Sequence, residues 1–533
     1  MKNWVKVVIT WSAALVWLFV VYAVFGFRFE TNDDAAIANI AAGAFGKDSQ
    51  YLIHVNIVIG WILRLLNLLV PGLAWYSLLN YFLLTLAFSA VGFVFQEKFR
   101  AVPGCAVYLL LLVTAGTDLF CRFQYTKNAA FLIASGLLLV IRRLGETKTS
   151  YWLGTALCLF GSMLRFDLLL PVMAVSFFAF LSVFTRISRG LRAKAAGSFL
   201  LIAAIGFSVF GVNRFAYKLD PEWDNFYLFN EAREGLFDYR LQNMGPAHEY
   251  YDLGVREAEA ALLSSWDIFD PDFFTAEKLD ELSAAIGRKK VVDSMLNFPA
   301  ALISLFFSNV YAVFAIFALA LVLLSDSKQA KVTALLIFVV LTAGLFALFW
   351  LGRMIERVQV SLTLAAALFA LSAIEVRGRK GINTLHMLVG AALAVSLLFL
   401  IPLKERNDYY LGTRLPTAGD FDAIRDDNEH LYLLSTEHFD KAMGYDVFSP
   451  RPPGYFDNIA FIGGWLINSP FELSTLRQYG VTNPFRDVVN SDTLLLLDST
   501  VKHEINRYIN VRYDVHARLE EYSDGIYRIV SEG

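Results

Sequence analysis

The chain has 533 residues, of which 56% are hydrophobic and only 18% are charged. A soluble chain of this length would divide into several domains and carry more charge, so these values argue against a soluble protein. The formal net charge of -3 comes without a basic stripe, which argues against a nucleic-acid partner. The three cysteines have neither metal-like nor disulfide-like spacing.

Long apolar runs recur from the N-terminus to about residue 402 and predict a polytopic α-helical membrane protein. The first run is too long for a signal peptide, and no small-residue cleavage site follows it, so we predict a retained span. The segment 51–70 mixes polar with apolar residues and is predicted to be a helix lying partly in the interface. About eleven spans are predicted: 5–27, 73–95, 102–118, 127–141, 151–164, 166–184, 197–214, 299–324, 331–350, 357–375 and 383–402.

Basic residues set the predicted orientation of these spans. Lys98, Arg142, Arg186 and Lys328 lie at alternate span ends, as a single cytoplasmic face requires, and Lys6 agrees with them. The N-terminus is therefore predicted to lie inside and, with an odd number of spans, the C-terminus outside. Nearly every other charged residue of the membrane part falls on the outward face.

Two parts follow from the drop in hydropathy near residue 405. Residues 1–404 are predicted to form the transmembrane domain, with outward loops over 28–72 and 215–298. Such a long second loop is typical of a functional lid, and a helix is expected over 275–297. Residues 405–533 are predicted to form a small extracytoplasmic α/β or α+β domain.

Short apolar runs carry the prediction for this C-terminal domain. Strands are expected at 430–435, 492–498 and 525–530, with a helix at 499–513. The turn-rich segment 449–465 carries aromatic residues that could line a sugar site, although a packed surface loop is the simpler interpretation.

Asp33 and Asp34 follow the first predicted span directly. Carboxylates held against a bilayer are costly and usually functional, so we interpret one of them as a catalytic base. If a helix starts here, the two side chains point in different directions and only one can face a site. Thr31 with Asp34 resembles a capping box, so Asp34 could cap while Asp33 reacts, or Asn32 could cap instead.

A single carboxylate suits one class of chemistry. Inverting transfer of a sugar needs one base to deprotonate the acceptor hydroxyl. It needs no second carboxylate when the leaving group is already a phosphate, but that phosphate needs positive charge or a metal. Arg353, Glu356 and Arg357 have the spacing of one helix face, and two guanidinium groups there would bind a phosphate ester. The alternative is an interfacial anchor with Glu356 paired to one arginine.

Further outward residues are weaker candidates. Arg122 and Lys127 could bind the donor phosphate or could snorkel at a span end. Candidates for acceptor binding or support of the site are His54, Asn56, Arg165, Asp167, Asn230 and Arg233. For each of these a structural role is the alternative, such as pairing of Arg165 with Asp167. His54 with Asp33 or Asp48 is a weak candidate pair for a divalent metal such as Mg²⁺ or Mn²⁺.

The layout resembles the GT-C class of integral-membrane glycosyltransferases. The resemblance rests on TNDDAAIANIAAG (31–43), FQYTKNAA (123–130), RFD (165–167) and LGRMIERV (351–358), and it covers residues 1–402. It implies a sugar donor on a polyprenyl phosphate, a hexosyl or pentosyl group in transfer, and an extracytoplasmic glycan, lipid or protein as acceptor. The catalytic carboxylate would match Asp33 or Asp34. Several members of the class carry a metal-binding carboxylate in a later loop. No such motif is clear in this sequence, so the resemblance does not establish a metal.

Other functions stay open at this point. A transporter or flippase for lipid-linked sugars would need alternating access, but the sequence shows no clear repeat. A membrane scaffold or sensor would leave the outward charges unexplained. A glycan polymerase or ligase that relies on Arg and His is an alternative within enzymes. The absence of N-x-S/T sequons and of paired cysteines favours a bacterial plasma membrane.

Overall fold

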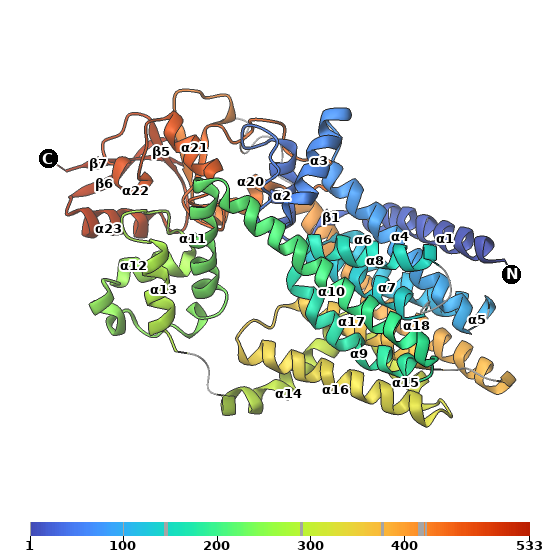
Figure 1. The fold of residues 1–533 in the computed structure, drawn as a ribbon. Helices are drawn as coiled ribbons and strands as arrows, with labels where there is room; N and C mark the ends of the chain where they lie inside the picture. The colour runs from blue at the N-terminus through green and yellow to red at the C-terminus, as the bar shows by residue number, and fades with distance from the viewer. Residues whose placement is uncertain are drawn as a thin grey trace.

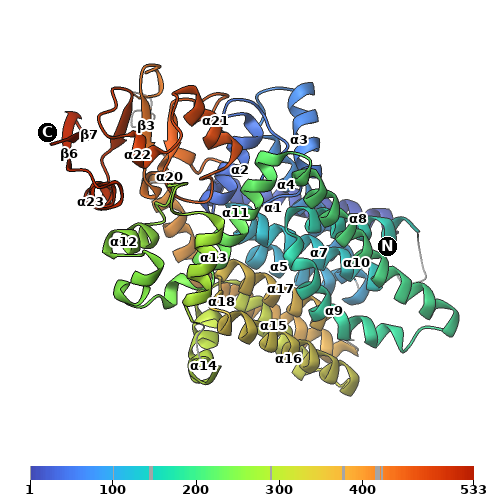
Figure 2. The same cartoon turned by 60° about the vertical axis from the view of Figure 1, so that its left-hand side comes forward.

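The computed structural model describes residues 2–99, 101–142, 148–287, 291–374, 378–413, 421 and 424–532. The fold is mostly helical and has two parts (Figure 1): a bundle of long apolar helices, and a smaller part that contains a five-stranded sheet. The N-terminus lies at the end of the bundle away from that sheet, and the C-terminus lies on the sheet side (Figure 2).

Among the described residues, eight helices are long and apolar enough to cross a membrane, and shorter apolar helices accompany them. The chain is thus a multi-pass membrane protein, while the count of eleven spans and their orientation stay predictions. The bundle consists of α1 (Asn3–Phe25), α4 (Trp75–Phe99), α5 (Ala101–Leu111) continued by α6 (Thr117–Cys121), α7 (Tyr125–Arg142), α8 (Lys148–Leu164), α9 (Leu169–Phe184), α10 (Arg189–Lys218), α14 (Val291–Ser308), α15 (Tyr311–Leu323), α16 (Lys328–Trp350), α17 (Glu356–Ala373) and α18 (Gly378–Thr413).

Two expected helices differ from the structure. The span expected over 299–324 is two helices, because the Asn309 side-chain oxygen accepts from the Ala312 backbone N–H at 3.3 Å and starts α15. The helix expected over 275–297 ends early: α13 (Ala276–Ala285) gives way to Ile286 in extended conformation. Val291 then starts α14, and residues 288–290 lie outside the described ones.

The first outward segment, residues 28–72, is held by one strand pair and contains two short helices. β1 (Arg28–Phe29) pairs in parallel with β2 (Arg122–Phe123), which joins the end of α1 to the start of α7. α2 (Asn32–Ala42) follows at once, and α3 (Ile57–Leu69) is the helix expected over 51–70. α3 starts late because the Asn56 side chain caps it, accepting from the Val58 N–H at 3.0 Å.

The sheet has the strand order β4-β3-β5-β7-β6, with β4, β3 and β5 parallel. The expected strands are confirmed as β3 (Leu431–Leu434), β5 (Leu494–Leu497) and β7 (Ile526–Ser531), and the expected helix as α23 (Lys502–Tyr513). Strands β4 (Ile459–Phe461) and β6 (Ala517–Ser523) were not expected. β4 is apolar and buried but only three residues long, and β6 is largely polar and exposed, so neither gives a clear strand signal.

The long second loop packs against this sheet. It contains α11 (Pro221–Phe237), α12 (Glu257–Ser265) and α13, and we call residues 219–287 the α11–α13 segment. Leu236 and Leu262 of the segment share one hydrophobic core with Leu431 and Leu494 of the sheet. The segment therefore forms a fixed wall joined to the C-terminal domain.

Candidate active site

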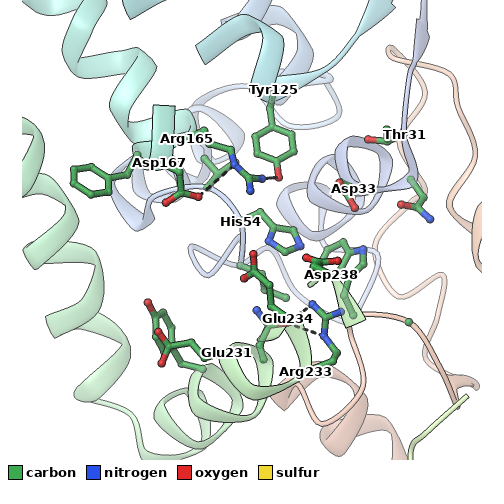
Figure 3. A pocket seen from close by; sticks show the side chains of 18 of the residues that line it. Thr31, Asp33, His54, Tyr125, Arg165, Asp167, Glu231, Arg233, Glu234 and Asp238 are labelled. Atoms are coloured by element: carbon green, nitrogen blue, oxygen red, sulfur yellow. Dashed lines mark hydrogen bonds and ion pairs between the residues drawn. The ribbon is translucent and has the colours of Figure 1, made fainter. Parts of the chain in front are cut away.

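A cavity of about 860 Å³ lies where the bundle, the first outward segment, the α11–α13 segment and the C-terminal domain meet. Four cations and five carboxylates line it, together with several aromatic rings, so it is a charged chamber. The charged lining residues are Asp33, Arg165, Asp167, Glu231, Arg233, Glu234, Asp238, Arg353 and Arg357. Figure 3 shows His54 between the Arg165–Tyr125 pair and the charged side chains of α11.

The two adjacent aspartates have different environments. Thr31 is the N-cap residue of α2, so the helix turn directs Asp33 into the cavity and Asp34 into the protein. Asp34 is fully buried, and its carboxylate accepts from Tyr76 Oη and from the Tyr125 backbone N–H, both at 3.0 Å. Burial, with Asp33 next to it, raises the pKa of Asp34 well above its usual range. Burial therefore favours the protonated form of Asp34, and Asp33 is the carboxylate of the pair that faces the cavity.

Arg357 and Arg353 both reach the cavity but not from one helix face. The expected helix through both residues is wrong, because α17 starts only at Glu356 and Arg353 lies in the preceding turn. Gly352 makes this turn with φ of +82°, and its carbonyl accepts from Gln242 Nε2 at 2.8 Å. Arg357 Nη2 lies 3.5 Å from Asp33 Oδ2. The base candidate and a cation are thus direct neighbours.

Arg353 is held by Glu234 of α11, which the sequence analysis did not select, and by Asp238, the residue that directly follows this helix. Its guanidinium contacts Glu234 at 2.5 Å and Asp238 at 2.8 Å. Burial acts to raise the pKa of Glu234, but the charge and hydrogen bond of Arg353, together with His54 and Arg165, outweigh burial and lower that pKa. The spacing of Asn230, Glu234 and Asp238 at four-residue steps was the available signal, since it places all three on one helix face.

Asn230 and Arg233, expected to support the site or contact the acceptor, both line the cavity. The Asn230 side-chain oxygen accepts from Arg233 Nη2 at 2.8 Å and from its Nε at 3.1 Å. This pair fixes the Arg233 guanidinium next to the ring of Trp266, at 5.8 Å from the ring centre. Both residues therefore hold the wall and present a cation to the cavity.

His54, Asn56, Arg165 and Asp167 also line the cavity. Arg165 donates to Tyr125 Oη, and its Nε lies 3.5 Å from Asp167 Oδ2, so the expected pairing is present. Burial lowers the pKa of His54 to about 4, which leaves the imidazole neutral at pH 7. A neutral ring can both donate and accept a hydrogen bond, which suits contact with a hydroxyl.

Arg122 and Lys127 do not line the cavity, which corrects their expected contact with a donor phosphate. Both are buried in an ion cluster with Asp118 and Glu30. Asp118 accepts from Arg122 Nε at 2.5 Å and from Lys127 Nζ at 2.6 Å. Arg122 follows the end of α6 and Lys127 lies in the first turn of α7, so both side chains lie beside these carboxylates. The position of a basic residue at the end of a predicted span does not reveal such an arrangement.

The C-terminal domain contributes to the cavity wall through Thr436, Phe439, Gly464 and Trp465. Gly464 and Trp465 belong to the aromatic segment considered for a sugar site. The C-terminal domain packs closely against the α11–α13 segment, because a Cβ added to Gly463 would overlap the side chains of Thr436 and Asp267. Asp267 Oδ1 in turn accepts from the Thr436 N–H at 2.7 Å. The wall is thus built jointly by the α11–α13 segment and the C-terminal domain.

Of the weak metal candidates, the structure places His54 and Asp33 at the same cavity. His54 lines the cavity, but Asp48 does not and instead lies 3.6 Å from Arg64. Within the described part of the chain, no three His, Cys, Asp or Glu side chains are grouped so that they could hold a metal ion. Asp33, Asp167, Glu234 and Asp238 are instead paired with arginines, which compete with a metal for these carboxylates.

Fold and site together define a multi-pass membrane protein with a charged cavity between its bundle and a smaller sheet domain. No protein-family model and no curated protein matches the sequence. Among solved structures it is similar to ArnT from Cupriavidus metallidurans in the apo state, at 14% identity, 98% coverage of this chain, 97% of that chain and a TM-score of 0.42. The same protein bound to undecaprenyl phosphate matches at 13% identity, the same coverage and a TM-score of 0.39. At these scores the likeness carries no argument about activity.

Proposed function

We propose that the protein is an inverting glycosyltransferase of the GT-C type, which moves a sugar from a polyprenyl phosphate to an extracytoplasmic glycan, lipid or protein. The reaction would take place at the outer face of a bacterial plasma membrane. The observation that carries the proposal is the placement of Asp33, whose carboxylate faces the cavity 3.5 Å from Arg357. A base candidate and a phosphate-binding cation side by side are what this transfer requires.

Asp33 would accept the proton of the acceptor hydroxyl. The hydroxyl oxygen then attacks the anomeric carbon of the donor sugar, and the bond from that carbon to the phosphate oxygen breaks. The electron pair leaves with the polyprenyl phosphate, so the leaving group needs no proton. The configuration at the anomeric carbon inverts because one displacement takes place on the face opposite the phosphate.

Arg357 is our choice for the residue that stabilises the leaving phosphate. When the phosphate binds Arg357, the ion pair with Asp33 weakens and the carboxylate becomes free to act as a base. Arg353 is held by Glu234 and Asp238 and would present a second, oriented cation. His54, Arg165 and Arg233, together with Trp465, would contact the sugar and the acceptor from the remaining walls.

The proposed class is tested with purified protein in lipid nanodiscs and a panel of polyprenyl-phosphate sugars. Release of the free polyprenyl phosphate is followed by mass spectrometry, with and without candidate acceptors. Turnover of one donor would establish the class and the sugar. Binding of a donor without turnover under any condition would instead favour a flippase, and absence of binding would favour a scaffold.

We expect Arg357→Gln to lower kcat/KM for the donor by about 10²-fold or more, because it removes charge from the leaving phosphate. Arg357→Lys should fall between this variant and the wild type, since lysine keeps the charge but not the bidentate geometry. The matched control is Arg64→Gln in α3, whose side chain is 54% exposed and outside the cavity. Equal effects of the Arg357 and Arg64 changes would contradict the assignment.

We expect chelation of divalent metals to leave donor turnover unchanged. The carboxylates of the cavity already face arginines, and the leaving phosphate has cations of its own. The measurement compares release of polyprenyl phosphate after EDTA treatment with release after addition of Mg²⁺ or Mn²⁺. A loss with EDTA that either metal restores would overturn this prediction and return the metal to the proposal.

A further inference from the structure

A second cavity, of about 560 Å³, lies between α9 and α16. On α9 it is lined by Phe178, Leu181, Ser182 and Thr185, and on α16 by Lys328, Gln329, Val332, Thr333 and Leu336. Both sets have the three- and four-residue spacing of a single helix face, so the groove lies between the facing sides of the two helices.

This groove is far from the catalytic cavity. α16 has 23 residues and ends at Trp350, two residues before the turn that carries Arg353. At 1.5 Å per residue its first residue, Lys328, lies about 33 Å from that end. The groove therefore lies at the opposite end of the bundle, which the distribution of basic residues predicts to be cytoplasmic.

The lining of the groove changes from apolar in one part to polar and cationic at its end. Phe178, Leu181 and Leu336 make one part apolar, whereas Thr185, Lys328 and Gln329 make its end polar and cationic. Gln329 also accepts from Arg186 Nη2 at 2.7 Å, which brings a second cation close to that end. An occupant must therefore join an apolar chain to a negatively charged head.

The surrounding charges favour an anion strongly. Segments 185–195 and 325–332, which flank the groove, contain one acidic residue, Asp326. They contain six basic ones: Arg186, Arg189, Arg192, Lys194, Lys328 and Lys331. The last carbonyls of α9 carry partial negative charge at this end of the groove. Arg192 donates to the Thr185 carbonyl at 3.1 Å and offsets that charge. Basic pockets between transmembrane helices on this side of a membrane bind anionic lipid heads.

We propose that the groove between α9 and α16 binds an anionic glycerophospholipid. Its acyl chain lies along Leu181 and Leu336, and its phosphate lies against Lys328 with Arg186 nearby. The lipid fills the space between two helices, so it stabilises their packing at the end opposite the catalytic cavity. This inference does not depend on the proposed glycosyltransferase activity.

The test uses the whole protein in nanodiscs that contain equal amounts of phosphatidylglycerol and phosphatidylcholine with the same acyl chains. Lipids retained after transfer to detergent are counted by native mass spectrometry. We expect retained phosphatidylglycerol to exceed phosphatidylcholine. Lys328→Gln should weaken this preference about five-fold, since one basic residue near the lipid head contributes about a factor of that size.

A second pair of variants tests the apolar part. Leu181→Trp fills the groove without changing charge and should abolish retention of the bound lipid. Arg142→Gln on α7 and Leu335→Trp on α16 are the matched controls, because both residues are exposed and lie outside the groove lining. Equal retention of the two lipids by the wild type would overturn the proposal, as would a preference that survives both Lys328→Gln and Leu181→Trp. Controls that lose the lipid as completely as the groove variants would overturn it as well.

Discussion

Replacing Asp33 by asparagine is expected to reduce sugar transfer by about 10²- to 10⁴-fold, the range that a general base contributes. Asparagine keeps the shape and polarity of the side chain, and Asp33 lies at the cavity surface, so folding should be unaffected. The measurement is transfer or donor hydrolysis in nanodiscs, with thermal inactivation as the test of folding. Donor binding should persist, because Arg357 and Arg353 remain.

Asp34→Asn is the matched control one residue away. Asparagine resembles a protonated Asp34: its oxygen can accept from Tyr76 and Tyr125, while its amide can donate to Thr31. We therefore expect activity close to that of the wild type. Full activity of Asp33→Asn, or loss of activity only in Asp34→Asn, would contradict the assignment of Asp33 as the base.

The same control has a pH signature. The pKa of Asp34 is raised in the folded protein, so the folded state holds a proton that the unfolded state releases. Its contribution to stability is full at pH values below the unfolded pKa and is lost as the pH rises through the folded pKa. Relative to the wild type, Asp34→Asn should become more resistant to heat as the pH rises, and a widening deficit would contradict a buried protonated Asp34.

Asp118→Ala is expected to destabilise the protein by about 3–5 kcal/mol, the cost of breaking a buried ion pair by removal of one partner. Arg122 and Lys127 would keep Glu30 as their ion-pair partner but lose Asp118, and Tyr311 would lose its 2.6 Å hydrogen bond. Activity should fall too, because Glu30 and the β1–β2 pairing lie on the path from α1 to Asp33. Thermal inactivation in nanodiscs measures the effect.

An exposed ion pair provides the comparison. Lys404 and Asp408 lie 2.8 Å apart on α18, with side chains 43% and 53% exposed. Such pairs contribute at most about 1 kcal/mol, so Asp408→Ala should hardly change the inactivation temperature. Similar losses from Asp118→Ala and Asp408→Ala would show that the cluster is not a structural centre. Asp118→Asn should fall between the two, since it keeps hydrogen bonds but removes the charge.

Apolar length and period were sufficient for much of the fold. Runs such as 73–95 and 331–350 predicted helices that the structure contains as α4 and α16. Short apolar runs likewise predicted β3, β5 and β7. The errors arose where a single residue overrides the pattern, through a polar side chain or through its backbone conformation. Asn309 starts a new helix inside an apolar run, and Gly352 ends α16 so that Arg353 and Arg357 do not share a helix.

The candidate site shows the same division. A membrane protein with carboxylates and arginines near one end of its spans is predictable from the chain alone, because apolar length and charge position are local properties. That Asp33 faces the cavity while Asp34 is buried, and that Arg122 and Lys127 belong to the ion cluster, became visible in the folded protein. Those outcomes depend on partners distant in sequence, such as Tyr76, Glu234 or Trp465, and burial and pairing with such partners decide what each charged group can do.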